Sequence, residues 1–140
     1  MGPLAGLKIV EMCPGGREHF AGMLLSDMGA EVIRVDSPVE TDYGYPPDRY
    51  RTMKRNRRAV DIDLTCPQGV EAMLHMMDRA DGFIEGNHPG VCEILGIGPE
   101  VALARNPRLV YGRMNGFGQE GPLADGVGFN LNFIPLTDTA

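Results

Sequence analysis

Short apolar runs alternate with helix-like segments along most of the chain, and this alternation is what most constrains its fold. Strand-like runs are predicted at residues 7–12, 31–36, 59–64, 81–86 and 108–114. Helices are predicted between them at residues 18–29, 67–80, 90–96 and 99–107. Strands that alternate with helices are typical of a parallel, doubly wound sheet. We therefore expect one α/β domain, for which 140 residues supply enough core.

The apolar patterns of these segments predict which faces are buried. Residues 18–29 are apolar on nearly every side and stop at Gly29, which predicts a helix buried between layers and closed by a glycine. Residues 67–80 have apolar side chains at helical spacing, which favours an amphipathic helix with methionines in the core: Val70, Met73, Leu74 and Met77. One face of the strand at 59–64 is predicted to be apolar, with Val60, Ile62 and Leu64.

Ligands of such sheets bind beyond the carboxyl ends of the strands. This places four segments on one rim: residues 13–19, 49–58, 86–90 and 115–122. The GxGxxG fingerprint is missing after the first strand, and the sequence contains no Walker A motif. We therefore do not expect NAD, FAD or a Walker-type nucleotide site.

The segment at residues 49–58 holds six of the thirteen basic residues and no acid, although the whole chain has a net charge of −6. A nucleic-acid binder usually spreads its positive charge over a face, so nucleic acid is not an expected partner. Two interpretations stay open for this segment. It binds a compact polyanion such as the phosphates of a cofactor, or it is a solvated loop.

The cysteines and the hydropathy pattern exclude several other classes of protein. Cys13, Cys66 and Cys92 are far apart and form no CxxC pair, so neither a disulfide scaffold nor a metal site is expected. No run is long enough to cross a membrane, and residues 1–15 lack the apolar region of a signal peptide. These features favour a cytoplasmic protein without a membrane partner.

The stretch at residues 116–133 contains five glycines, which let a backbone approach a ligand closely. It leads to Phe129 and Asn130, which cannot act as an acid or a base. Either the stretch is a tight turn that closes the sheet, or it faces a ligand.

Six segments, in chain order, resemble one superfamily: GPLAGLKIVEM, LLSDMGAEVIRVDSP, KRNRRAVDIDLTCPQG, ADGFIEGNHPGVCEILGIGPE, NPRLVYGRMNGFGQEGPLA and GFNLNF. It is the superfamily of family III CoA-transferases and α-methylacyl-CoA racemases, and the resemblance is closest to the racemase branch. It implies a Rossmann-like large domain that binds coenzyme A, with no cofactor beyond the CoA of the substrate. Residues 1–125 would form this domain. Residues 126–140 would begin the catalytic loop and the connection to a missing remainder, in a homodimer or a self-associated form.

Racemisation of a 2-methylacyl thioester needs two proton-moving groups around the α-carbon and a group that holds the enolate oxygen. The racemase motif GHDINY maps onto residues 128–133, so Phe129 and Asn130 stand at the His and Asp positions. No catalytic residue is therefore identified. Phe129 fits the GFD pattern of the transferase branch, whose Asp nucleophile would lie beyond Ala140.

The resemblance also implies a set of CoA- and substrate-binding residues. Ser37, Thr65 and His88 replace residues that are basic in relatives, which predicts weakened CoA contacts. The complete set is Arg34, Ser37, Arg55, Arg57, Arg58, Ile62, Asp63, Leu64, Thr65, Gly86, Asn87, His88, Gly128, Phe129 and Asn130.

Three hypotheses about function stay open. The chain is a racemase-like acyl-CoA protein that is catalytically incomplete, a transferase fragment, or a non-catalytic CoA-binding or dimerisation module. In each case we expect CoA binding to be weak and salt-sensitive, through residues 49–65 and 86–90. With the resemblance in hand, the ligand-facing interpretation of the glycine-rich stretch is the favoured one.

Overall fold

The computed structural model describes residues 2–12, 16–36, 52–126, 128 and 130–137. Within these ranges five strands form one parallel sheet in the order β3-β2-β1-β4-β5. The strands are β1 (Lys8–Met12), β2 (Glu31–Asp36), β3 (Arg58–Asp61), β4 (Gly82–Glu85) and β5 (Val110–Arg113). The predicted parallel, doubly wound α/β sheet is confirmed.

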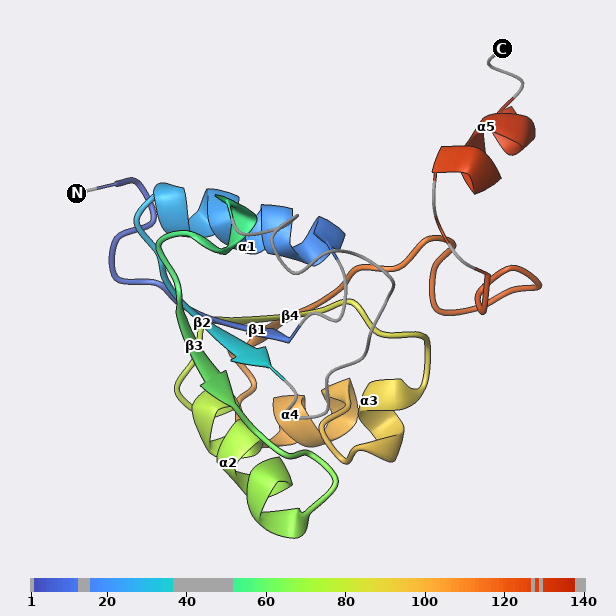
Figure 1. Ribbon diagram of the computed structural model, residues 1–140. Coiled ribbons are helices and arrows are strands. Elements are labelled where there is room, and N and C mark those ends of the chain that lie inside the picture. The colour runs from blue at the N-terminus through green and yellow to red at the C-terminus, as the bar shows by residue number, and fades with distance from the viewer. Residues whose placement is uncertain (1, 13–15, 37–51, 127, 129, 138–140) are drawn as a thin grey trace.

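Helices cover both faces of the sheet, as Figure 1 shows. One face is covered by α1 (Gly16–Asp27). The other carries α2 (Pro67–Met77), α3 (Val91–Ile94) and α4 (Pro99–Arg105). This arrangement follows from the parallel strands, because each crossover helix must pass over one face of the sheet.

The larger part of the core lies on the side of α2, α3 and α4. Phe83 of β4 and Met73 of α2 are fully buried in it, and Val10 and Met12 of β1 point the same way. Ile9 lies in the smaller cluster, together with Leu25 of α1. The alternation along β1 therefore serves two cores, which explains why this strand is a nearly continuous apolar run.

Helix α1 ends as its sequence predicts, although its burial does not follow the prediction. Gly29 has a φ of +101°, and its N–H donates to the carbonyl of Ser26 at 2.9 Å. Phe20 and Leu24 are 50% and 39% exposed. The expectation of a helix buried between two layers is thus wrong, because Phe20 and Leu24 stay exposed although both the sheet and the segment Thr52–Lys54 pack against α1.

Two elements were not expected from the sequence, and one strand is less buried than expected. The 3-10 helix η2 (Thr52–Lys54) precedes β3, and α5 (Asn130–Thr137) stands away from the sheet in Figure 1. Val60 is 39% exposed because β3 is an edge strand. Within the described ranges, every helix is too short or too polar to span a bilayer.

Candidate functional site at the carboxyl rim of the sheet

Three of the predicted site segments leave the sheet at the same edge. Residues 62–65 follow β3, residues 86–90 follow β4, and residues 115–128 follow β5. Because all strands are parallel, these loops form one rim at the carboxyl ends. We call residues 115–128 the glycine loop. The predicted place on this rim is confirmed for residues 86–90 and 115–122, and residues 62–65 join them there. Residues 13–15 and 37–51 lie outside the described residues.

The loop at residues 62–65 is held by its own side chains. Asp63 Oδ1 accepts hydrogen bonds from the Thr65 hydroxyl at 2.6 Å and from its backbone N–H at 2.9 Å. These two bonds lower the pKa of Asp63. Ile62 is buried, and Leu64 packs against the core. These contacts fix the backbone of the loop.

The first helix turn of α2 approaches this loop closely. A Cβ at Gly69 would lie only 1.8 Å from the Asp63 carbonyl oxygen, so this position requires glycine. The N-terminus of α2 therefore lies directly behind residues 63–65.

In the loop at residues 86–90, the side chain of Asn87 turns toward the protein. Glu85, the last residue of β4, accepts hydrogen bonds at Oε2 from the Asn87 backbone N–H at 2.7 Å and from its amide at 3.3 Å. His88 is exposed. Gly90 has a φ of +85° and is the N-cap of α3. The side chain of Asn87 is thus engaged with the protein itself.

The glycine loop closes on itself at its base. A Cβ at Gly116 would lie 2.5 Å from the Cα of Gly128, so the two ends touch. Asn115 and Gly118 exchange two hydrogen bonds, of 2.8 and 2.9 Å. The rings of Phe117 and Phe133 lie 5.1 Å apart, which packs the loop against α5.

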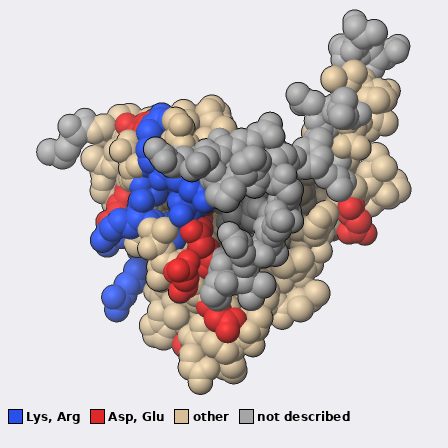
Figure 2. All heavy atoms as spheres, in the orientation of Figure 1, with Lys and Arg blue, Asp and Glu red and all other residues tan. Residues whose placement is uncertain are grey.

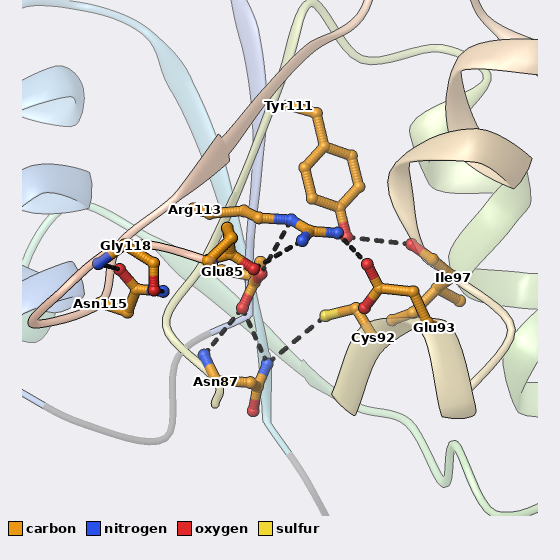
Figure 3. A network of polar contacts seen from close by, with 10 residues as sticks. Glu85, Asn87, Cys92, Glu93, Ile97, Tyr111, Arg113, Asn115 and Gly118 are labelled. Carbon is orange, nitrogen blue, oxygen red and sulfur yellow. Dashed lines mark hydrogen bonds and ion pairs between the residues drawn. The ribbon is translucent and has the colours of Figure 1, made fainter. Parts of the chain in front are cut away.

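A network of polar and ionisable groups lies between β4, β5 and α3, and Figure 3 shows its members. Burial raises the pKa of Glu85, and the Asn87 donors offset this only in part. Burial likewise raises the pKa of Cys92 to about 11 and the pKa of Tyr111 above its ordinary value. Cys92 therefore stays a thiol at neutral pH and is a poor nucleophile.

Arg113 connects the members of this network. Its Nη1 donates to Gln119 Oε1 at 2.6 Å, its Nη2 donates to Glu93 Oε1, and its Nε lies 3.6 Å from Glu85 Oε1. Its guanidinium carbon is 5.5 Å from the centroid of the Tyr111 ring.

A second buried cluster lies on the α1 face. Glu11 of β1 is fully buried, lies 2.7 Å from His19 Nδ1, and accepts a hydrogen bond from Arg57 Nη1. Burial acts to raise the pKa of Glu11, but the bonds from His19 and Arg57 outweigh it and lower this pKa. A Cβ at Gly22 would lie 2.0 Å from Glu11 Oε2, so α1 leaves room for the ion pair only because residue 22 is glycine.

The four predicted CoA-binding arginines that the structure describes are engaged elsewhere or covered. Arg34 donates through Nε and Nη2 to both oxygens of Asp36, at 2.7 Å each. The Arg57 side chain is fully buried, and its Nε and Nη2 find no acceptor among the described residues.

The other two arginines lie near the amino ends of the strands, opposite the carboxyl rim. Arg55 bonds Asp27, the last residue of α1, and Arg58 bonds Glu31, the first residue of β2. The expectation that residues 49–58 lie on the carboxyl rim is therefore wrong for Arg55 and Arg58. Figure 2 shows basic side chains over η2 and the start of β3, with acidic ones beside them.

Of the remaining predicted site residues, some lie among the described residues and some do not. Ser37 and Phe129 lie outside the described residues, and Asn130 begins α5. Gly86 follows Glu85 directly, and Gly128 lies against Gly116. In the described ranges, no group of three or more His, Cys, Asp or Glu side chains could hold a metal ion.

We did not identify from the sequence the charged residues at the centre of the two polar clusters, one on each face of the sheet. Glu11, Glu85 and Arg113 each stand at or next to the carboxyl end of an apolar strand. That position was the available signal, because such residues face the rim where parallel sheets bind ligands.

Comparison with known families matches residues 4–137 to CoA-transferase family III. The chain belongs to this family. The predicted superfamily and the Rossmann-like large-domain fold are thereby confirmed.

Named relatives include both branches of the superfamily. The chain is 37% identical over 134 residues to α-methylacyl-CoA racemase of Mus musculus, a match that spans 96% of this chain and 33% of the racemase. It is 34% identical over 139 residues to the probable fatty acyl-CoA transferase Rv3272 of Mycobacterium tuberculosis, across 92% of this chain and 35% of that protein. The chain spans about a third of the length of the curated relatives it matches.

A crystal structure of Rv3272 from Mycobacterium tuberculosis superposes with a TM-score of 0.86 at 32% identity. The superposition covers 97% of this chain and 40% of that one. The agreement extends over nearly the whole of this chain, so the two proteins share this fold.

Proposed function

We propose that this chain provides the CoA-binding part of a protein that acts on acyl-CoA thioesters. The observation that carries the proposal is the convergence of residues 62–65, residues 86–90 and the glycine loop on one rim, in a family whose named relatives are acyl-CoA enzymes. In this proposal the phosphate and thioester oxygens contact backbone N–H groups of these turns other than those of Thr65, Asn87 and Gly118, which donate within the chain.

The proposed contacts depend mainly on these loops. Arg34 is paired with Asp36, Arg57 is covered, and Arg55 and Arg58 lie at the other edge. We therefore expect weak binding with a smaller salt dependence than six basic residues on the rim would give.

For the reaction, we propose a racemase-like or transferase-like role in which these 140 residues do not move the α-proton by themselves. Phe129 and Asn130 take the positions of the racemase His and Asp, and neither transfers a proton at neutral pH. The aromatic residue at position 129 favours the transferase branch, in which a carboxylate nucleophile comes from elsewhere. A non-catalytic CoA-binding module is the remaining alternative.

The proposal is tested by calorimetry and thermal shift with acetyl-CoA at low and high salt. We expect Thr65→Asp, which adds a negative charge on the rim, to weaken binding by about tenfold. Ala104→Asp places the same charge on exposed α4, near the opposite edge, and should leave the affinity unchanged. If millimolar acetyl-CoA gives neither heat nor a thermal shift, CoA binding by this chain is ruled out.

A companion measurement follows deuterium uptake at the α-carbon of 2-methylacyl-CoA in heavy water. We expect no uptake with this chain alone. Uptake that is lost on substitution of Asp125 would contradict the proposed lack of proton transfer.

A further inference from the structure

Arg113 is fixed on its protein side by several independent contacts. Its guanidinium lies between Glu85 and Glu93 and beside the ring of Tyr111, as Figure 3 shows. The Tyr111 hydroxyl donates to the Ile97 carbonyl at 3.1 Å, and its ring meets the buried Phe83 ring edge-on at 4.9 Å. The position of the guanidinium is therefore set by the core.

The same guanidinium reaches out to the glycine loop. Nη1 donates to Gln119 Oε1 at 2.6 Å, between two glycines with positive φ, Gly118 (+87°) and Gly121 (+101°). A Cβ at either glycine would meet nothing within 4 Å, so this part of the loop is open on both sides of Gln119. The bond from Arg113 thus joins a sparsely packed loop to a rigid support.

The network also joins the loop to its neighbour on the rim. Glu85, which faces Arg113 Nε, holds the Asn87 backbone N–H at 2.7 Å. Arg113 therefore contacts two groups: the Glu85 carboxylate, which bonds the backbone of residues 86–90, and the Gln119 amide of the glycine loop. One side chain relates the positions of two loops that the proposed function places around an acyl-CoA.

We propose that Arg113 is a positioning residue, which through Gln119 holds the glycine loop at a fixed place relative to residues 86–90 and thereby supports acyl-CoA binding. The ligand in this statement rests on the proposed function, whereas the placement of the loop does not. Glu85 and Glu93 already neutralise the guanidinium. For this reason Arg113 does not act as the counter-ion of an acidic acyl group.

The sharpest variant is Gln119→Leu, because it removes the acceptor and leaves the buried charges intact. Gln119→Glu keeps an oxygen for Arg113 and serves as the rescue. Glu120→Leu changes the exposed neighbour in the same loop and is the matched control. Arg113→Lys keeps the positive charge but cannot serve all three partners at once.

The first readout is amide hydrogen exchange of the chain without ligand. We expect residues 115–126 to exchange at least tenfold faster in Gln119→Leu and Arg113→Lys, and at nearly the wild-type rate in Gln119→Glu and Glu120→Leu. Unchanged exchange in Gln119→Leu would overturn the positioning role, whether or not the protein binds CoA.

The second readout compares the affinities for acetyl-CoA and succinyl-CoA. Gln119→Leu and Arg113→Lys should weaken both ligands by the same factor, several-fold or more. A larger loss for succinyl-CoA would overturn the proposal in favour of direct contact between Arg113 and the acyl carboxylate. If the wild type binds neither ligand, the proposed function fails, and the exchange data still decide the role of Arg113.

Discussion

At the scale of single residues, two buried glutamates on opposite faces of the sheet have opposite electrostatic surroundings. Glu11 accepts hydrogen bonds from Arg57 and lies against His19, which lowers its pKa below 4.5 despite burial. Glu85 is also buried, but its donors are mainly the neutral groups of Asn87, and its pKa lies above 4.5. The two carboxylates should therefore contribute to stability in opposite pH ranges.

The sign of each contribution can be predicted. A lowered pKa means that Glu11 stabilises the folded chain above pH 4.5 and that this contribution is lost as the pH falls below it. A raised pKa means that the contribution of Glu85 is complete below pH 4.5 and is lost as the pH rises through the folded-state value. Urea unfolding of wild type, Glu11→Gln and Glu85→Gln from pH 3.5 to 8 measures both.

Relative to Glu11→Gln, the wild type should gain stability as the pH rises through the acid range. Relative to Glu85→Gln, it should lose stability as the pH rises. Two variants with the same pH trend would show that the surroundings described for one of the carboxylates are wrong.

At the scale of elements, the contact between α1 and β1 depends on a glycine. Alanine is better than glycine inside an exposed helix by about 1 kcal/mol. At position 22, however, the added Cβ would lie 2.0 Å from Glu11 Oε2 and 2.6 Å from Arg57 Nη1. Overpacking against a buried ion pair outweighs the gain in helix propensity.

We predict that Gly22→Ala destabilises the chain by about 1–3 kcal/mol. Thermal or urea unfolding measures this difference. Ala21→Gly, in the same turn of α1, is the comparison, and it should lose only about 1 kcal/mol of helix propensity. A Gly22→Ala variant that melts above the wild type would contradict the close approach.

The sequence was a good guide to the elements and a poor guide to the charges. Apolar runs predicted β1 and the parallel order of the strands, and a glycine predicted the end of α1. Both succeeded because burial and backbone conformation leave local patterns in a sequence. The place of Arg58 at the amino edge could not be predicted, because it depends on the register of β3 against β2. The partners of Glu11 are likewise up to 46 residues away along the chain.

Helix α5 shows another limit of local patterns. It contains Pro135, which argues against a helix in sequence terms, and its Ile134 and Leu136 are 48% and 62% exposed. That residues 126–140 begin the catalytic loop and the connection to a missing remainder stays a prediction. Within them residues 130–137 are helical, and α5 contacts the glycine loop through Phe133 and Phe117.

At the scale of the whole molecule, apolar side chains are exposed on several sides. Ile94 of α3 is 87% exposed, Val110 of β5 is 72% exposed, and Phe20 of α1 is 50% exposed. In the described part of the chain, β5 is also a sheet edge that pairs on one side only. Exposed apolar surface and an open edge both favour association with another chain.

We predict that the chain self-associates in a concentration-dependent manner, and that the edge of β5 takes part. Sedimentation velocity over a hundredfold concentration range measures the association. Val110→Lys, which places a charge on the edge strand, should weaken association more than Ile94→Lys, which places one on α3. A chain that sediments as a monomer at every concentration would contradict the prediction.

The contact between Gly116 and Gly128 has a consequence for how the glycine loop can vary. Since its two ends are joined, added residues near the exposed tip at Leu123 would enlarge the loop without moving β5 or α5. The loop can then be lengthened or shortened between its ends while the sheet stays as it is. A fluorophore attached at Leu123 would for the same reason report on ligand entry from a place where the fold tolerates the label.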